Sequence, residues 1–198
     1  MKKFLWVFAF VLLSAATALA GNGGYALRFD GVDDYVSVPD DVSLDFTEFT
    51  IEMWIYKLSS NNYKLIGQNN SNNHERGFVF GIDNSDEFHI EVWSSAVTFT
   101  SVTSTETIPN NEWVHLTMSW KKNDRLKGYI NGKLVIDVAT IDADITNATP
   151  MIIGKAPWYD LNENHFNGYM DEIRIWNDVR TETEIKHNMH KELTGNEA

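Results

Sequence analysis

One segment near the C-terminal end specifies a strand followed directly by a helix: Phe166-Asn-Gly-Tyr-Met-Asp-Glu-Ile-Arg-Ile-Trp-Asn177 and then Asp178-Val-Arg-Thr-Glu-Thr-Glu-Ile185. In the first part, isoleucines alternate with polar residues, which is the period of two that predicts a β-strand. In the second part, Thr181 and Glu184 have the spacing of a capping box, in which each side chain accepts a hydrogen bond from the other residue's backbone amide. We therefore expect a late strand and one short helix after it.

Similar short strand patterns precede this segment along the chain. Asn131-Gly132 separates the apolar-rich segments 126–130 and 134–138, and this dipeptide strongly predicts a β-hairpin. The segments 25–30 and 35–38 flank Asp30-Gly31, and we expect them to pair with each other in the same way. Further strands are expected at 49–56, 64–67, 77–82, 87–93, 113–120 and 151–154.

About a dozen short strands with turn residues between them predict an all-β fold. The fold class we expect is a two-sheet antiparallel sandwich of the jelly-roll type, with one short C-terminal helix. The chain has 198 residues, of which 43% are hydrophobic, so it can bury one sizeable core. It contains no internal repeat and no proline-rich linker. We expect a single domain, residues 21–198.

The first twenty residues have the pattern of a secretory signal peptide. Met1-Lys-Lys is followed by the apolar segment 4–13 and by Ala18-Leu-Ala20, so cleavage is expected between Ala20 and Gly21. The alternative is a membrane anchor, but the apolar segment is shorter than the roughly 20 residues of a spanning helix. We expect a secreted or periplasmic protein with no membrane span in the mature chain.

Composition narrows the classes of partner. The chain has no cysteine, so no disulfide supports an exported domain, and stability must come from the core, with help from a metal if one binds. The formal net charge is −12, and removal of Lys2 and Lys3 leaves 14 basic against 28 acidic residues, or −14. This argues against nucleic acid and anionic membranes, which require basic patches. The acidity keeps an exported protein soluble and suits neutral ligands and divalent cations.

An ordered set of short motifs resembles the laminin-G-like jelly-roll family of the concanavalin A-like lectin/glucanase superfamily. The resemblance covers nearly the whole mature chain and implies two stacked antiparallel sheets in which the first and last strands are neighbours. It does not imply one function, because the fold hosts lectins, adhesion modules, enzymes and scaffolds. The motifs are Ala26-Leu-Arg-Phe-Asp-Gly-Val-Asp-Asp-Tyr-Val36, Phe49-Thr-Ile-Glu-Met-Trp-Ile55, Glu112-Trp-Val-His115, Tyr129-Ile-Asn-Gly-Lys133, Ile153-Gly154 and Gly168-Tyr-Met-Asp-Glu-Ile-Arg-Ile-Trp176.

The resemblance also implies a structural calcium ion where the terminal strands meet. Carried over by position, Asp30 and Asp171 would supply carboxylates and Gly31 a backbone carbonyl, the hard oxygen ligands that calcium takes. The alternative is that Asp30 only forms a turn and Asp171 only accepts a hydrogen bond. Calcium takes six or more ligands and three can be named, so both interpretations stay open.

Alternation also collects aromatic and charged residues on a sheet face that points away from the core. Sugar rings stack on indole rings and their hydroxyl groups bond to charged side chains, so this mixture is typical of a glycan-binding surface. His89 and Trp93 lie outside the shared motifs, and we interpret them as ligand-binding residues. Residues inside the motifs are interpreted as structural, with a Glu52–Arg174 pair between adjacent strands. The row expected on this face is Glu52, Trp54, Tyr56, His89, Glu91, Trp93, Trp113, His115, Thr117, Glu172, Arg174 and Trp176.

The long segment 156–165 is a second candidate for glycan binding, because loops of this length in a compact domain are often functional. The alternative is that Trp158 folds back onto the sandwich as a hydrophobic plug. The segment 68–76 is a weaker candidate, since a run of asparagines is more often a solvated turn. The glycan-binding residues expected in the longer loop are Trp158, Tyr159, Asn162, Asn164 and His165.

The motifs that would support catalysis are missing from the sequence. It contains no Glu-x-Asp-x-x-Glu run of the related glucanases, no Gly-x-Ser-x-Gly and no His-Glu-x-x-His. The predicted function is therefore a non-catalytic, lectin-like module that binds an extracellular glycan or surface protein. The alternative is a protein–protein adhesion or scaffold module without a glycan ligand, and the third possibility is a glycoside hydrolase of the same fold.

Overall fold

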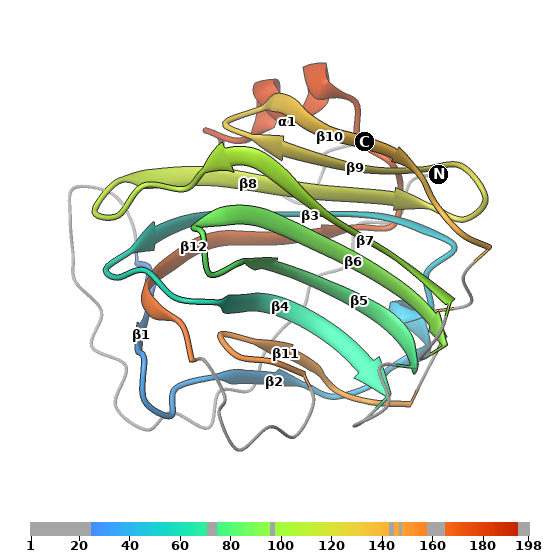
Figure 1. The fold of residues 1–198 in the computed structure, drawn as a ribbon, viewed down its shortest axis with the longest axis horizontal. Helices are drawn as coiled ribbons and strands as arrows, with labels where there is room; N and C mark the ends of the chain where they lie inside the picture. Colours follow the sequence, from blue (N-terminus) through green and yellow to red (C-terminus); the bar gives the residue numbers. More distant parts are fainter. Residues whose placement is uncertain are drawn as a thin grey trace.

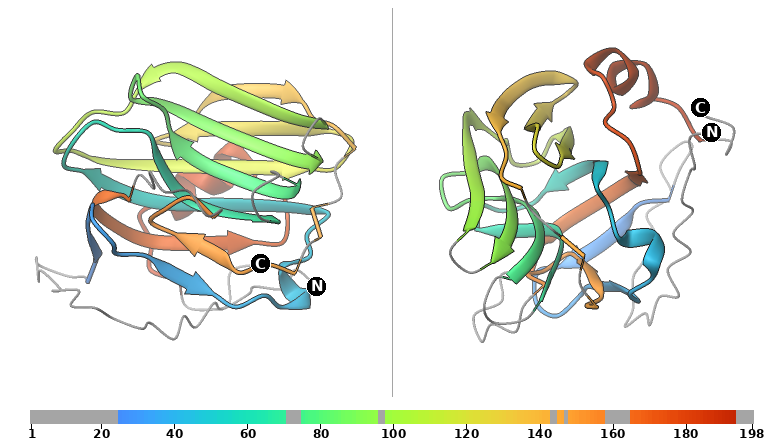
Figure 2. Two further views of the ribbon diagram at one scale, coloured as in Figure 1. Left: turned by 60° about the horizontal axis from the view of Figure 1, so that its bottom comes forward. Right: turned by 90° about the vertical axis from the view of Figure 1, so that its right-hand side faces the viewer.

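The computed structural model describes residues 25–70, 75–95, 98–142, 145–146, 148–157 and 165–193. The expected signal peptide, residues 1–20, lies outside the described residues. The described chain forms two antiparallel sheets that pack face to face, with one short α-helix after the last strand (Figures 1 and 2). The predicted all-β sandwich with one C-terminal helix is therefore confirmed. Within the ranges given above, no helix is long and apolar enough to cross a membrane.

The first sheet holds the first and the last strand of the described chain. Its terminal strands β1 and β12 are neighbours, paired from Leu27 with Met170 to Asp30 with Asn167. In spatial order its strands are β1 (Leu27–Asp30), β12 (Asn167–Trp176), β3 (Glu48–Lys57), β8 (Trp113–Lys121), β9 (Arg125–Ile130) and β10 (Lys133–Ala139).

The second sheet also has six strands, four of which follow one another along the chain as a meander. These four, β4 to β7, run side by side in Figure 1. In spatial order the strands are β2 (Val36–Val38), β11 (Met151–Ile153), β4 (Tyr63–Asn70), β5 (Glu75–Ile82), β6 (Glu87–Ser95) and β7 (Thr98–Thr107).

The core is filled from both sheets by residues that alternate along the strands. Phe49 of β3, at the centre of one cluster, lies 5.0 Å from Phe78 of β5 and 5.5 Å from Trp120 of β8 between ring centroids. Aromatic pairs at such distances add to the free energy of burial. The residues predicted to form the inner face of β3 are Phe49, Ile51, Met53 and Ile55, and all are fully buried.

An ion pair ties the two sheets together at one end of the sandwich. Lys57, the last residue of β3, is fully buried, and its Nζ contacts Asp86 Oδ1 in the turn between β5 and β6. The other oxygen of Asp86 accepts a hydrogen bond of 2.5 Å from Ser60 Oγ. A buried ammonium needs such a partner, because its desolvation is otherwise uncompensated.

The late segment folds as its pattern predicted. After β12, the helix α1 (Glu182–Asn188) begins with a complete capping box between Thr181 and Glu184. The strand itself is interrupted, since its pairing with β3 shifts register between Asp171 and Arg174, with Glu172 at φ +50°. This bulge is a feature that the alternation of isoleucines does not reveal.

Two expectations about strands were wrong. The segments 25–30 and 35–38 do not form a hairpin, because β1 pairs with β12 in the first sheet and β2 pairs with β11 in the second. The strand β7 was missed, since its Thr- and Ser-rich sequence at a sheet edge has little apolar alternation. The hairpin at Asn131-Gly132 is confirmed as β9–β10.

We expect replacement of Lys57 by alanine to lower the free energy of unfolding by about 3 to 5 kcal/mol, because it breaks a buried ion pair and opens a cavity. Lys133→Ala is the control, since Lys133 forms an exposed pair with Glu106 at 2.6 Å and should cost less than about 1 kcal/mol. Urea unfolding measures both. Equal costs would show that the Lys57–Asp86 pair does not hold the sheets together.

Candidate functional site

The outer face of the first sheet carries a group of polar and aromatic residues, here called the first-sheet polar cluster, in which all but the half-buried Trp54 are buried: Glu52, Trp54, His115, Arg174 and Trp176. Glu52 of β3 lies opposite Arg174 of β12 in the ladder, and Arg174 Nη1 is 3.5 Å from Glu52 Oε1. Trp176 Nε1 donates to the same oxygen at 3.0 Å. The Glu52–Arg174 pair predicted from the sequence is therefore present, between adjacent strands.

The C-terminal end of α1 covers this cluster. Trp54 Nε1 donates to the carbonyl of Met189 at 2.7 Å, and Arg174 donates to the carbonyls of Asn188, at 2.9 Å, and Lys191. The last carbonyls of a helix lack partners within the helix, so these side chains satisfy them. Figure 2 shows α1 on the side of the first sheet that faces away from the second. The cluster is thus closed by the chain's own terminal segment and is structural.

Burial controls the protonation of two members of this cluster. Burial raises the pKa of Glu52, although the charges of Arg174 and the Trp176 hydrogen bond oppose the shift. Burial, together with the positive charges of Arg174 and His190, lowers the pKa of His115 to about 3. His115 is therefore neutral at ordinary pH, and its Nε2 lies 3.6 Å from Glu52 Oε2.

The outer face of the second sheet, on β4 to β7, carries the other polar and aromatic residues. The expectation that they continue the row of the first sheet was wrong, because β6 belongs to the second sheet. On β6, Phe88, Ile90 and Val92 point into the core, so His89, Glu91 and Trp93 point outward. We call this surface the second-sheet outer face.

Three of its side chains form a hydrogen-bonded chain along β6. His89 Nε2 is 2.5 Å from Glu91 Oε1, Trp93 Nε1 donates to Glu91 Oε2 at 2.6 Å, and His89 Nδ1 contacts Thr103 Oγ1 at 2.7 Å. Burial alone would raise the pKa of Glu91, but the bonds from His89 and Trp93 and the charge of Lys64 outweigh it and lower that pKa. Glu91 is therefore a carboxylate held in place by its neighbours.

An aromatic pair lies beside this chain. Trp93 and Phe99 face each other directly across β6 and β7, and their rings stack at 4.1 Å with 21° between the planes. Trp93 is half-buried, while Phe99 is 44% exposed. Sequence reasoning missed Phe99 because it missed β7, and the richness of this segment in threonine, a residue that favours strands, was the signal that could have found it.

The row that contains this pair continues to β4. Asn69 lies opposite Gly77 of β5, and Gly77 lies opposite Trp93, so the three residues lie in line across the sheet. The sequence placed Asn69 in a solvated loop, but it belongs to β4 and is buried. Sequence reasoning named it only as part of the segment 68–76, the weaker of the two loop candidates.

Most of the glycan-binding residues predicted in the long segment 156–165 cannot be placed. Trp158, Tyr159, Asn162 and Asn164 lie outside the described residues. His165 is half-buried just before β12, which belongs to the first sheet, whereas His89 and Trp93 belong to the second. The described chain therefore brings together His89 and Trp93 from the predicted set.

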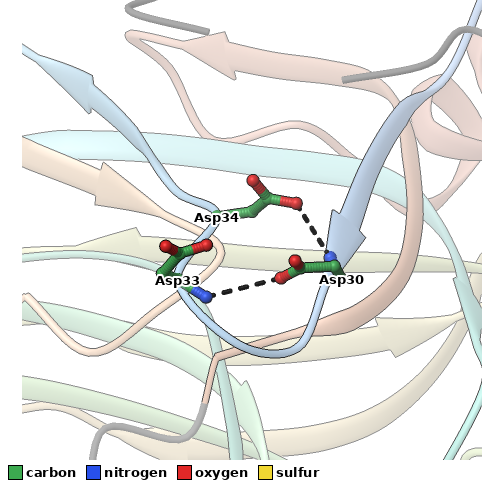
Figure 3. A group of neighbouring side chains, drawn as sticks. All are labelled: Asp30, Asp33 and Asp34. Carbon is green, nitrogen blue, oxygen red and sulfur yellow. Dashed lines mark hydrogen bonds between the residues drawn. The ribbon is translucent and has the colours of Figure 1, made fainter. Parts of the chain in front are cut away.

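A group of three carboxylates follows β1, as Figure 3 shows. Asp30, Asp33 and Asp34 each present an oxygen, and these oxygens lie within 4.8 Å of one another. Asp30 Oδ1 accepts from the backbone of Val32 at 2.8 Å, and this bond is the main reason that the pKa of Asp30 is lowered. Asp34 Oδ2 accepts from the Asp30 amide at 3.0 Å. Three clustered carboxylates suit a divalent cation of the calcium type.

The predicted calcium ligands are not all brought together. Asp30 pairs with Asn167 at one end of the β1–β12 ladder, whereas Asp171 lies four residues further along β12, about 13 Å away. The strands are neighbours as expected, but their antiparallel register separates the two carboxylates. Burial raises the pKa of Asp171, and its Oδ1 accepts from the Glu172 amide at 2.8 Å. Gly31 remains beside Asp30, in the turn at φ +80°.

Comparison with known proteins agrees with this architecture. The Laminin_G_3 model, described as the concanavalin A-like lectin/glucanases superfamily, matches residues 30–186. The chain belongs to the Laminin_G_3 family. Among curated proteins, none matches the chain by sequence.

Several solved structures share the fold of this Laminin_G_3 chain. Domain 4 of an extracellular arabinanase from Geobacillus stearothermophilus, in complex with arabinotriose, is 20% identical, with a TM-score of 0.68 over 88% of this chain and 81% of that one. A sialidase carbohydrate-binding module from Ruminococcus gnavus, bound to α2,3-sialyllactose, is 15% identical, with a TM-score of 0.70 over 82% and 94%. A Bacteroides ovatus protein, provisionally described as carbohydrate binding, is 21% identical, with a TM-score of 0.68 over 83% of this chain. The Laminin_G_3 chain spans 46% of that protein's length.

The protonation of His115 makes stability depend on pH. Its pKa rises from about 3 to about 6.5 on unfolding, so the unfolded state binds more protons in this range and stability falls as pH decreases. Between about pH 7 and pH 5 the loss is about 2 kcal/mol. We expect His115→Gln to remove this loss and the exposed His187→Gln to keep it, as measured by urea unfolding at each pH. Parallel curves for wild type and His115→Gln would contradict the assignment.

Proposed function

We propose that this chain is an exported, non-catalytic module that binds a glycan on the second-sheet outer face. The observation that carries the proposal is the stacked Trp93–Phe99 pair beside the ionised Glu91 and His89. An aromatic surface next to hydrogen-bonding side chains matches the two faces of a sugar, its apolar C–H surface and its hydroxyl groups. The relatives solved with arabinotriose and with sialyllactose support a sugar as the class of ligand.

The non-catalytic part of the proposal rests on the partners of the acidic residues. Glu52 and Glu172 both pair with Arg174, and Glu91 pairs with His89. A retaining or inverting glycosidase needs two carboxylates that flank the scissile bond, one of them available as an acid. These three glutamates come from separate strands and are each held by a base. Export rests on the signal-peptide pattern of residues 1–20.

A bound calcium ion is a further part of the proposal. Asp30, Asp33 and Asp34 would hold it, with backbone carbonyls and water completing the six to eight oxygens that calcium takes. Its role would be to fix the turn that leads from β1 in the first sheet to β2 in the second. Asp171 is not part of this set.

Glycan binding is tested on an array and by calorimetry that includes arabinotriose and α2,3-sialyllactose. We expect saturable binding, and we expect Trp93→Ala to weaken it about tenfold or more because the stacking surface is lost. Trp113→Ala is the matched control, since Trp113 is a 44% exposed tryptophan on the first sheet. Its affinity should equal that of wild type, and circular dichroism checks that both variants fold.

The possible outcomes separate the functions. If Trp93→Ala is largely unfolded but its folded fraction binds the glycan as wild type does, Trp93 has a structural role. No binding to any glycan by folded wild-type protein would favour the adhesion or scaffold module. Hydrolysis of an arrayed glycan would instead require the catalytic alternative.

Calcium is tested by thermal unfolding with about 10 mM calcium and again with chelator. For a site of about 1 mM affinity, typical of extracellular modules, we expect a rise in Tm of about 3 to 6 °C. Asp33→Asn should abolish the rise and Asp171→Asn should not. Equal Tm values with calcium and with chelator would remove the ion from the proposal.

A further inference from the structure

Phe99 is a large aromatic side chain that is 44% exposed on β7, the last strand in the spatial order of the second sheet. It lies opposite Trp93 of β6, and the two rings stack with their centroids 4.1 Å apart and 21° between their planes. Rings stacked so closely on two neighbouring strands stand side by side, with their faces turned along the line that joins the strands. One face of Phe99 is therefore covered by Trp93, and the other is turned away from β6, past the edge of the sheet.

The edge strand beside this ring lacks the residues that usually protect an exposed edge. β7 contains no lysine, arginine or proline, and its one charged residue, Glu106, lies at the end of the strand far from Phe99. Native edge strands commonly carry lysine or proline, or are covered by another segment. The cross-strand pair with Trp93 stabilises the sheet, which explains an aromatic residue at position 99 but not a ring face left to water. A ligand that covers Phe99 accounts for the exposed face.

This edge does not favour an added β-strand as the ligand. The pairing of β6 with β7 shifts register next to Glu87 at one end and next to Trp93 at the other. Such bulges bend and twist an edge strand, and they thereby disfavour its pairing with another chain. Between them, the regular part from Phe99 to Thr103 is about 14 Å long. The edge therefore favours a short ligand that contacts the side chains of β7.

The side chains that follow Phe99 on the same face of β7 carry hydroxyl groups. Ser101 is exposed and lies opposite Glu91. Thr103 is half-buried and lies opposite His89, whose Nδ1 contacts Thr103 Oγ1 at 2.7 Å. These side chains alternate along the strand, so they follow the ring at intervals of about 7 Å. An aromatic face followed by groups that can both donate and accept matches the apolar face and the hydroxyl groups of a sugar chain.

We propose that Phe99 is the residue that stacks on the sugar, and that a neutral oligosaccharide lies along β7 from Phe99 toward Thr103. Trp93 is then a positioning residue, which supports the ring of Phe99 from behind. This inference rests on the proposed function, because it takes the second-sheet outer face as the site of glycan binding. It adds the edge strand as the path of the ligand and the class of sugar.

The charges near β7 select a neutral sugar. Recognition of an acidic sugar needs a basic side chain at its carboxylate, and β7 has none. Lys64, whose charge acts on Glu91, lies on β4, three strands and about 14 Å from β7. Lys133 reaches the far end of β7 but is paired there with Glu106. A carboxylate on a ligand beside Ser101 would be repelled by Glu91, so we expect neutral oligosaccharides such as arabinotriose to bind in preference to α2,3-sialyllactose.

The test compares Phe99→Leu with Phe99→Tyr. Leucine keeps an apolar side chain at the edge but lacks the flat face, so the affinity for the neutral oligosaccharides bound by wild type should fall about tenfold or more. Tyrosine keeps the flat face, so its affinity should stay within about twofold of wild type. Because position 99 is exposed at a sheet edge, Tm should change by less than about 4 °C in both variants. Calorimetry and thermal unfolding measure the two effects on the same samples.

Trp93→Phe and Leu134→Ala are the controls. Trp93→Phe keeps a ring behind Phe99, so it should lose less affinity than Phe99→Leu does. Leu134 is 36% exposed on β10, the edge strand of the other sheet, and Leu134→Ala should bind as wild type does. A loss in Phe99→Leu without a loss in Leu134→Ala distinguishes a ligand-stacking ring from exposed apolar surface at a sheet edge in general.

The outcomes distinguish this inference from the proposed function. If folded wild type binds no glycan, the proposed function and this inference both fail. If wild type binds and Phe99→Leu binds equally well, the inference fails while the function stands. A greater loss of affinity in Trp93→Phe than in Phe99→Leu would place the sugar on Trp93 and would also overturn the inference. Tighter binding of α2,3-sialyllactose than of neutral oligosaccharides would overturn the assignment to neutral sugars.

Discussion

The ion pair between Arg174 and Glu52 is the interaction on which the first sheet and the C-terminal segment both depend. Arg174 lies on the last strand, and it contacts Glu52 on β3, Glu172 on its own strand and the carbonyls that end α1. A buried guanidinium must have all of these partners, because each unmet donor or charge costs free energy in a low dielectric. One side chain therefore holds the last strand against the third and holds the helix against the sheet.

This arrangement makes the two outer faces of the sandwich chemically different. On the first sheet, the first-sheet polar cluster is covered by the terminal segment, and its hydrogen-bonding groups are largely used within the protein, although Trp113 on the same sheet is exposed. On the second sheet, the chain His89–Glu91–Trp93 is internally bonded, but the aromatic pair beside it is partly exposed at the edge of the sheet. Residues of the same types are structural on one face and are candidates for ligand binding on the other.

Local pattern predicted more of the fold than of the candidate site. The inner residues of β3, the hairpin at Asn131-Gly132 and the capping box of α1 depend on periods and spacings that are visible along the chain. The bulge after Asp171 and the separation of β1 from β2 depend on which strands become neighbours, and alternation is the same for any choice of neighbour. The edge strand β7 was missed for a related reason, because a polar edge strand buries few apolar residues.

The amino-acid sequence by itself determined the sandwich, the capped helix and the residue types of both outer faces, since burial of alternating apolar residues decides which side chains point inward. Only the tertiary structure decided that His89 and Trp93 lie on a different sheet from Trp54 and His115. It also decided that Asp30 gathers with Asp33 and Asp34 and not with Asp171, and that Asn69 is buried beside a glycine. These facts follow from strand order and register, which are set by contacts between residues far apart in the chain.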